Sequence, residues 1–379
     1  MPRVTGRTSA YVTAHTPPLP SPPPRRGEGG SRGPDERGVA LVLTLIIVAL
    51  VSVLVLEYHF EAVVELDLAD NYGSAVQAYH VAMSGIRLAQ ELLAYDDKQS
   101  DGPQDDWHRI GLVPACMPPQ TFLTLAMASA AAPALATGLA GQGAVPEAEA
   151  TEGPDRGCVS LKINVEEERL PINALVPVAL PDDAGEALSE EAARILEDWE
   201  VIFETLFIQL DVDAGLLDAL VGWLEDNGPM RTVRELSLVP GFDAETVKKL
   251  SLLVTAYGSP RLDTDQLEYP KVNVNTANRQ VLHALIDGLA DGAGDVTGYV
   301  DDIMVLRQDN LLQGRQFENT SELQDDLPAE VQAVFDKFAT VQGTYFTVTS
   351  VAQVEDIQKT VIAVLKPGDG DEPVYFKVE

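Results

Sequence analysis

An uncharged apolar run from Val39 to Leu56, interrupted only by Thr44 and Ser52, constrains the fold of this chain more than any other feature. As a helix the run would be roughly 27 Å long, close to the hydrocarbon thickness of a bilayer. Arginines precede the run and acids follow it, so the positive-inside tendency places the N-terminus in the cytoplasm and the rest of the chain outside. No small-residue cleavage site follows the run, so we expect one retained membrane span at 39–56.

The apolar pattern continues beyond the predicted span. Large apolar side chains recur at spacings of three and four residues, which predicts that residues 57–95 extend the same helix as an amphipathic segment. We expect its apolar stripe to pack on a globular head. The stripe consists of Phe60, Val64, Leu68, Tyr72, Val76, Tyr79, Met83 and Ile86.

The first 38 residues form a basic leader in an otherwise acidic chain. They hold six Arg and three acids, a net charge of +3, so the remaining residues hold 20 basic and 56 acidic groups, a net charge of −36. Frequent prolines and the lack of apolar periodicity predict disorder up to residue 36. So acidic a body repels nucleic acid and anionic lipid surfaces, and we expect no nucleic-acid partner.

Two cysteines, Cys116 and Cys158, flank a stretch rich in Ala and Gly. Neither belongs to a C-x-x-C pair and no His cluster stands near them, which argues against a metal site at these positions. Outside the cytoplasm a disulfide between them is one alternative, and two unpaired core thiols are the other.

A group of aspartates follows the predicted helix. Because Ca²⁺ takes oxygen ligands, they are weak candidates for a structural calcium site, and no other cofactor is expected. Their spacing does not match an EF-hand, so a solvated acidic loop is the alternative. The candidates are Asp96, Asp97, Asp101, Asp105 and Asp106.

The body divides into a head and an inserted helical region. Residues 96–180 read as the first part of the head, with a low-complexity loop and a strand from Cys158, and the alternation in 341–379 predicts three antiparallel strands. Between them, 181–340 read as short capped helices, and we expect Asn275 or Thr276 to cap one of them. Two similar capped turns, "TVREL" at 232–236 and "NTSEL" at 319–323, each follow an asparagine segment, which predicts two related units.

A basic leader that ends in Gly38, followed by an uncharged helix with an amphipathic continuation, resembles a type IV prepilin or pseudopilin. The resemblance implies that prepilin peptidase cuts after Gly38 and that the new amine of Val39 is methylated. Most members of that family have Glu at the fifth mature position, where this chain has Leu43. The K-type minor pseudopilin of type II secretion normally lacks this Glu. The implied assembly helix presents Leu43, Leu45, Ile46, Leu50 and Leu54.

Two segments of the body also resemble K-type pseudopilins, the strand, acidic turn and "INAL" at 158–175 and "VNVNTA" at 272–277. The resemblance implies an α+β pilin-like fold, with the long N-terminal helix packed on an antiparallel sheet and an inserted all-helical domain. It implies a bacterial inner-membrane protein with its bulk in the periplasm, at the tip of a pseudopilus that supports protein export. Its implied partners are other minor pseudopilins, the major pseudopilin, prepilin peptidase, the inner-membrane assembly platform and membrane lipid.

Two rival functions remain. "VNVNTA" is also similar to helix-hairpin-helix DNA uptake proteins, but the corresponding hairpin carries Asp287, Asp291 and Asp295, which would repel phosphate. A membrane-anchored hydrolase is the other rival. The five His are scattered, and the sequence contains no H-E-x-x-H, G-x-S-x-G or P-loop motif, so we expect no enzyme.

Overall fold

The structure is a computed structural model of the chain. It describes residues 34–96, 99–111, 116–118, 157–181, 185–263, 266–290, 294–323, 327–368 and 372–379. The chain divides into two compact units, residues 1–67 and residues 68–379.

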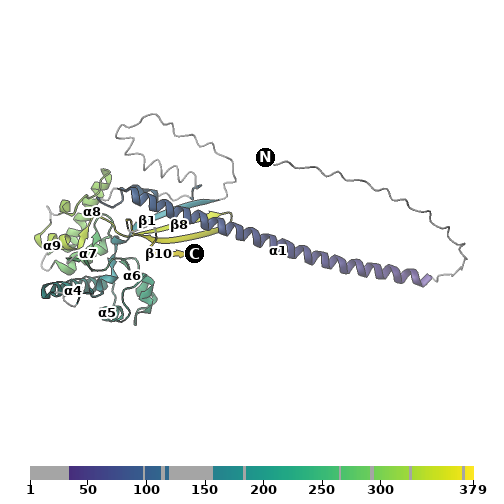
Figure 1. The fold of residues 1–379 in the computed structure, drawn as a ribbon, viewed down its shortest axis with the longest axis horizontal. Helices are drawn as coiled ribbons and strands as arrows, with labels where there is room; N and C mark the ends of the chain where they lie inside the picture. The colour runs from purple at the N-terminus through teal and green to yellow at the C-terminus, as the bar shows by residue number, and fades with distance from the viewer. Residues whose placement is uncertain are drawn as a thin grey trace, which may run out of the picture. The chain divides into compact units, whose positions relative to one another are not determined.

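The first unit contains the first part of helix α1 (Pro34–Tyr95), drawn in purple in Figure 1. Proline suits the first turn of a helix because the N–H that it lacks would have no partner there. The disorder expected up to residue 36 is therefore wrong for residues 34–36, which are helical. From Gly38 to Glu61 every side chain is exposed, so this part of the helix has no core of its own.

The second unit is built on a four-stranded antiparallel sheet. Its strands are ordered β1 (Cys158–Val165), β8 (Phe346–Val354), β9 (Ile357–Leu365) and β10 (Tyr375–Val378). The three strands predicted in 341–379 are thus confirmed. Strand β1 pairs with β8 from Val165 opposite Phe346 to Cys158 opposite Gln353. The chain therefore leaves the sheet after residue 165 and re-enters it at residue 346.

The C-terminal part of α1 packs on one face of this sheet, as expected. Its buried side chains include Ile86 and Leu93, which join alternate residues of the strands in one apolar cluster. Helix α2 (Asp106–Gly111) adds Trp107, whose ring meets Phe346 edge-on at a centroid distance of 5.3 Å. A Cβ at Gly85 would lie 2.2 Å from Ser350 Oγ, so with serine at position 350 a side chain at position 85 would force Ser350 or the helix to move.

The face of α1 that meets the sheet includes only the last part of the predicted stripe. Small residues fill the contact, with Ala78, Ala82 and Ala89 fully buried. Of the predicted stripe, Ile86 is buried and Tyr79 and Met83 pack at the edge of the cluster, whereas Leu68 and Tyr72 are exposed. The prediction was wrong for the exposed residues and missed the alanines, because a close helix-to-sheet contact selects small side chains, and a pattern of large apolar residues does not reveal them.

The helical region contains nearly the same order of elements twice, except that the first copy has one additional short helix, η2 (Ile172–Leu175). The first copy runs β2 (Leu170–Pro171), η2 (Ile172–Leu175), α4 (Glu186–Gln209), α5 (Gly215–Asn227), η3 (Val233–Leu238), α6 (Ala244–Leu250) and β3 (Val254–Thr255). The second runs β6 (Val272–Asn273), α7 (Arg279–Leu289), α8 (Val296–Leu312), η4 (Thr320–Leu323), α9 (Ala329–Phe338) and β7 (Ala339–Thr340). In each copy the first strand pairs in parallel with the last. A short hairpin of β4 (Arg261–Asp263) and β5 (Gln266–Glu268) lies between the copies in sequence, and η1 (Glu166–Glu168) precedes them.

One buried asparagine closes each copy. The amide of Asn173 donates to Met230 O at 2.8 Å and accepts from Met230 N at 2.8 Å. In the second copy Asn275 makes the same pair of bonds with Phe317, at 2.9 and 3.0 Å. We expected Asn275 or Thr276 to cap the following helix, but Asn278 occupies the N-cap. Both asparagines therefore join segments that lie far apart in sequence.

Capped turns follow each asparagine pair. Glu235 accepts from the N–H of Thr232 at 3.0 Å, and Glu322 accepts from the N–H of Asn319 at 3.1 Å. The helical region begins earlier than the expected residue 181, because Leu170 already belongs to its apolar core. Residues 170–175, assigned from sequence to the head, are part of this region.

Candidate functional site

The predicted cleavage point lies within α1. A Cβ built at Gly38 has no heavy atom of the described residues within 4 Å, apart from its chain neighbours and the backbone of its own helix. Val39 is 69% exposed. A side chain at this position of the helix would therefore point into open space. Leu43, at the fifth position after Gly38, is likewise exposed and carries no charge that a neighbouring amine could meet.

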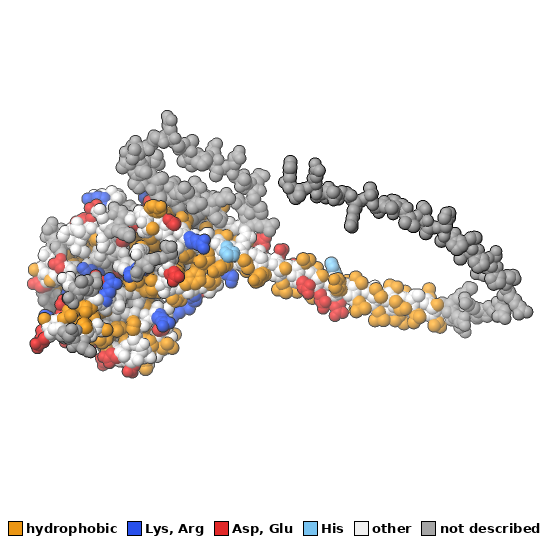
Figure 2. All heavy atoms as spheres, in the orientation of Figure 1, with side chains coloured by type: hydrophobic (Ala, Val, Ile, Leu, Met, Phe, Trp, Pro, Cys, Tyr) orange, Lys and Arg blue, Asp and Glu red, His pale blue; other side chains and the backbone are white. Residues whose placement is uncertain are grey.

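The predicted assembly residues form an apolar surface that the protein itself does not cover. Leu43, Leu45, Ile46, Leu50 and Leu54 are each more than half exposed. Figure 2 shows hydrophobic side chains covering this end of α1, with acidic side chains farther along the helix. Residues 38–95 contain an apolar window long enough to cross a membrane, and none of that window is buried, unlike the core helix of a soluble protein. The helix is compatible with a single-pass membrane anchor.

Three of the predicted calcium ligands meet at the end of α1. Asp96, Asp101 and Asp105 each offer one carboxylate oxygen, and these oxygens lie within 4.8 Å of one another. We call these three residues the carboxylate cluster. Asp106 begins α2 and is not part of the cluster, and Asp97 lies outside the described residues.

Hydrogen bonds hold the carboxylate cluster in place. Asp101 is buried and accepts from the N–H of Gly343 at 2.7 Å, and Asp105 accepts from the N–H of Gly102 at 2.6 Å and from Gln316. Two ligands of one Ca²⁺, each about 2.4 Å from the ion, are at most about 4.8 Å apart. The spacing of these oxygens therefore fits one cation that touches all three carboxylates.

A disulfide joins Cys116 and Cys158, with a Cα–Cα distance of 5.1 Å. Next to it, Met117 exchanges two backbone hydrogen bonds with Val159, at 3.0 and 2.8 Å. The disulfide thus ties residues 116–118 to the edge of β1. The sequence left open a disulfide or two unpaired thiols, and the structure has the disulfide.

Two adjacent glutamates were missed by the sequence reasoning. Glu166 is buried and accepts hydrogen bonds from the hydroxyls of Thr255 in the helical region and Thr347 in the sheet. Glu167 accepts from the N–H groups of Thr344 and Tyr345, at 3.0 and 3.2 Å. Burial raises the pKa of Glu167 to about 8. A run of three acids normally indicates a solvated turn, and here it is the joint between the sheet and the helical region.

No model of a protein family matches this sequence, and no curated relative matches it. Among solved structures, the chain is similar to one in the GspK-GspI-GspJ complex from the enterotoxigenic Escherichia coli type 2 secretion system. The two share 17% sequence identity, the match covers 83% of this chain and 97% of that chain, and the TM-score is 0.45. With similarity this low, the functional argument depends on the residues of this chain.

Proposed function

We propose that this chain is a minor pseudopilin of a type II protein secretion system that starts or caps the tip of the periplasmic pseudopilus. The observation that carries the proposal is α1 itself. One helix combines an exposed apolar half, which begins at Arg37-Gly38, with a half that packs on an antiparallel sheet. A plain anchor has no need to continue as the central helix of the head.

The apolar half of α1 would serve two environments in turn. In the inner membrane, lipid covers the side chains from Val39 to Leu56, and in the fibre the helices of neighbouring subunits replace the lipid. Prepilin peptidase would cut after Gly38, which has no side chain beside the peptide bond. Methylation of the Val39 amine would follow.

A place at the tip is supported by two features. Leu43 cannot provide the carboxylate that pairs with the amine of a neighbouring subunit in most members of the family. The helical region, residues 170–340, enlarges the head beyond the helix and sheet that a repeating subunit needs. Both features suit a subunit with a neighbour on one side only, so its partners would be other minor pseudopilins and, below them, the major pseudopilin.

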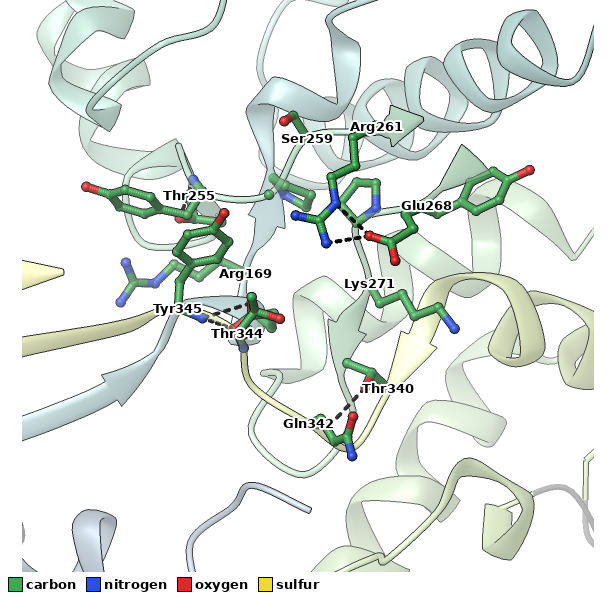
Figure 3. Close-up of a pocket in the computed structure, with 16 residues that line it drawn as sticks. Arg169, Thr255, Ser259, Arg261, Glu268, Lys271, Thr340, Gln342, Thr344 and Tyr345 are labelled. Atoms are coloured by element: carbon green, nitrogen blue, oxygen red, sulfur yellow. Dashed lines mark hydrogen bonds and ion pairs between the residues drawn. The ribbon is translucent and has the colours of Figure 1, made fainter. Parts of the chain in front are cut away.

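The rival functions find less support in the described residues. The hollow between the sheet and the helical region (Figure 3) has neither histidine nor cysteine among its described lining residues, so it offers no Ser-His or Cys-His pair. Asp287 near the end of α7 and Asp295 at the N-cap of α8 stand where a DNA-binding hairpin needs cations. The carboxylate cluster would hold a structural Ca²⁺ that steadies the end of α1.

Mass spectrometry of the protein isolated from membranes tests the proposal. The mature chain should begin at a methylated Val39, and Gly38→Ala should leave the leader attached. Gly73→Ala is the matched control, because Gly73 is a second glycine of α1 with open space around it. An intact leader on the unaltered membrane protein would contradict the proposal and favour a plain anchor.

A further inference from the structure

The two edges of the four-stranded sheet differ in what pairs with them. At β1, the disulfide of Cys116 and Cys158 and the backbone hydrogen bonds between Met117 and Val159 hold residues 116–118 along the outer side of the strand. At the other edge lies β10, which Figure 1 shows as a short arrow beside the C-terminus. Within the described part of the chain, β10 pairs with β9 and with no strand or isolated bridge on its outer side.

The pairing of β10 with β9 decides which of its backbone groups point outward. Glu379 and Thr360 exchange two backbone hydrogen bonds, at 2.8 and 3.1 Å. In an antiparallel ladder the residue pairs that exchange such bonds alternate with pairs that do not. Lys377, two residues before Glu379, therefore also bonds toward β9. The residues on either side of it, Phe376 and Val378, have their N–H and C=O groups directed away from β9.

The side chains of the same two residues are apolar and exposed. Phe376 lies opposite Ala363 and Val378 lies opposite Val361, and both partners belong to the apolar cluster on which α1 packs. Because directly opposite residues share a face of the sheet, Phe376 and Val378 lie on the face that α1 covers farther in. They are nevertheless 41% and 42% exposed. An edge with unpaired backbone and exposed apolar side chains is a template for pairing with another strand.

We propose that β10 receives an extended strand of a partner protein, which adds to the sheet at this edge. The outward N–H and C=O groups of Phe376 and Val378 recur at the two-residue spacing of a strand, so the backbone of an extended chain can pair with all of them. A helix pairs its own backbone groups and would leave these unmet. The inference uses only the sheet of the second unit, so its failure would leave the pseudopilin proposal standing.

A second copy of this chain fits the edge less well than a different protein. Two β10 strands related by a two-fold axis would use all of the outward groups only with Phe376 of one copy opposite Val378 of the other. That register sets Lys377 directly opposite Lys377 of the second copy, and like charges so placed destabilise a sheet. The 20 basic and 56 acidic residues after the leader add repulsion between copies. We therefore expect a partner strand with apolar residues opposite Phe376 and Val378 and no cation opposite Lys377.

Fluorescence anisotropy with the full chain in detergent micelles tests this inference. The probe is a fluorescein-labelled, amidated peptide of sequence Ser-Thr-Val-Thr-Val-Thr-Ser. The peptide should bind, and methylation of both valine N–H groups should raise Kd at least tenfold, because these groups donate to the outward C=O groups of β10. Methylation of the two threonine N–H groups that follow the valines is the matched control. These groups point away from β10, so the control should change Kd less than threefold.

A variant of the protein tests the same contact from the other side. Val378→Pro removes one outward N–H and leaves the bonds of Lys377 and Glu379 to β9, so it should raise Kd at least fivefold. Val378→Thr keeps the N–H and nearly the same shape, and should leave Kd within twofold. No binding of the unmodified peptide at millimolar concentration, or equal binding of the two methylated peptides, would overturn the inference whether or not Val378→Pro folds. Dimerisation of the full chain in sedimentation velocity that Val378→Pro abolishes would overturn the choice of a partner protein in favour of a second copy.

Discussion

The contact between Gly85 of α1 and Ser350 of β8 predicts how three variants change the free energy of unfolding. Ser350 Oγ is fully buried and has no hydrogen-bond partner among the described residues, and it faces the helix backbone at Gly85. An unsatisfied buried hydroxyl costs about 1–3 kcal/mol. We therefore expect Ser350→Ala to leave the free energy of unfolding unchanged or to raise it, although it shortens the side chain.

Gly85→Ala alone should destabilise the protein. Its new Cβ would stand 2.2 Å from Ser350 Oγ, and such overpacking costs about 1–3 kcal/mol. Alanine recovers about 1 kcal/mol through its higher helix propensity, so the expected net loss is about 0–2 kcal/mol. In the double variant the next obstacle is the Cβ of residue 350, at 3.1 Å, which a small shift accommodates.

The double variant should therefore be more stable than Gly85→Ala by more than Ser350→Ala gains alone. The expected coupling is about 1–3 kcal/mol, as for two residues in direct contact. Urea unfolding of the full chain in non-ionic micelles, followed by tryptophan fluorescence, measures it, since Trp107 belongs to the same apolar cluster. If the changes in the free energy of unfolding of the two single variants sum to that of the double variant within about 0.5 kcal/mol, residues 85 and 350 are not in contact and the reasoning is refuted.

Three further outcomes follow from the second unit. Asn275→Ala should lower the free energy of unfolding by about 2–5 kcal/mol, since it leaves the N–H and C=O of Phe317 unpaired. Asn278→Ala removes only an N-cap and should cost about 1 kcal/mol. Equal losses of the two variants in urea unfolding would refute the pairing of Asn275 with Phe317. Cys158→Ser should lower the free energy of unfolding by about 4 kcal/mol on chain-entropy grounds, because the disulfide joins residues 42 apart in sequence. If the disulfide does not form, urea unfolding under non-reducing conditions would show the same free energy of unfolding for the variant and the unaltered protein. In differential scanning fluorimetry, millimolar Ca²⁺ should raise the thermal midpoint of the unaltered protein but not that of Asp101→Asn, and EDTA should reverse the shift. No shift in the unaltered protein would rule out the calcium site.

Much of the architecture could be predicted because local signals and the global fold agree. The capping box of Thr232 and Glu235 is formed as its spacing indicates, and Asp243 caps the next helix by accepting from Thr246 N at 2.7 Å. The three C-terminal strands alternate clearly enough to be placed from their pattern alone. These features depend on neighbours within a few residues, which a sequence displays directly.

The remaining features depend on contacts between distant residues. Nothing near Ala78 or Gly85 indicates that small side chains meet the sheet, because the reason lies more than 250 residues away at Ser350. The burial of Glu166 depends on hydroxyls that belong to β3 and β8, far from it in sequence. For Asn275 the adjacent helix start suggested a cap, and only the fold brings Phe317 within reach.

The helical region is attached to the sheet as a side branch. Val165 and Phe346 face each other in the β1–β8 pair, and the N–H of Glu166 donates to Tyr345 O at 2.8 Å. The chain therefore departs and returns at adjoining residues, as it would in a hairpin with an ordinary turn. Exchanging residues 167–344 for a short turn keeps the strand register, and leaves a minimal head of helix and sheet. Such a join allows the branch to change in size and surface while the sheet that receives α1 stays the same.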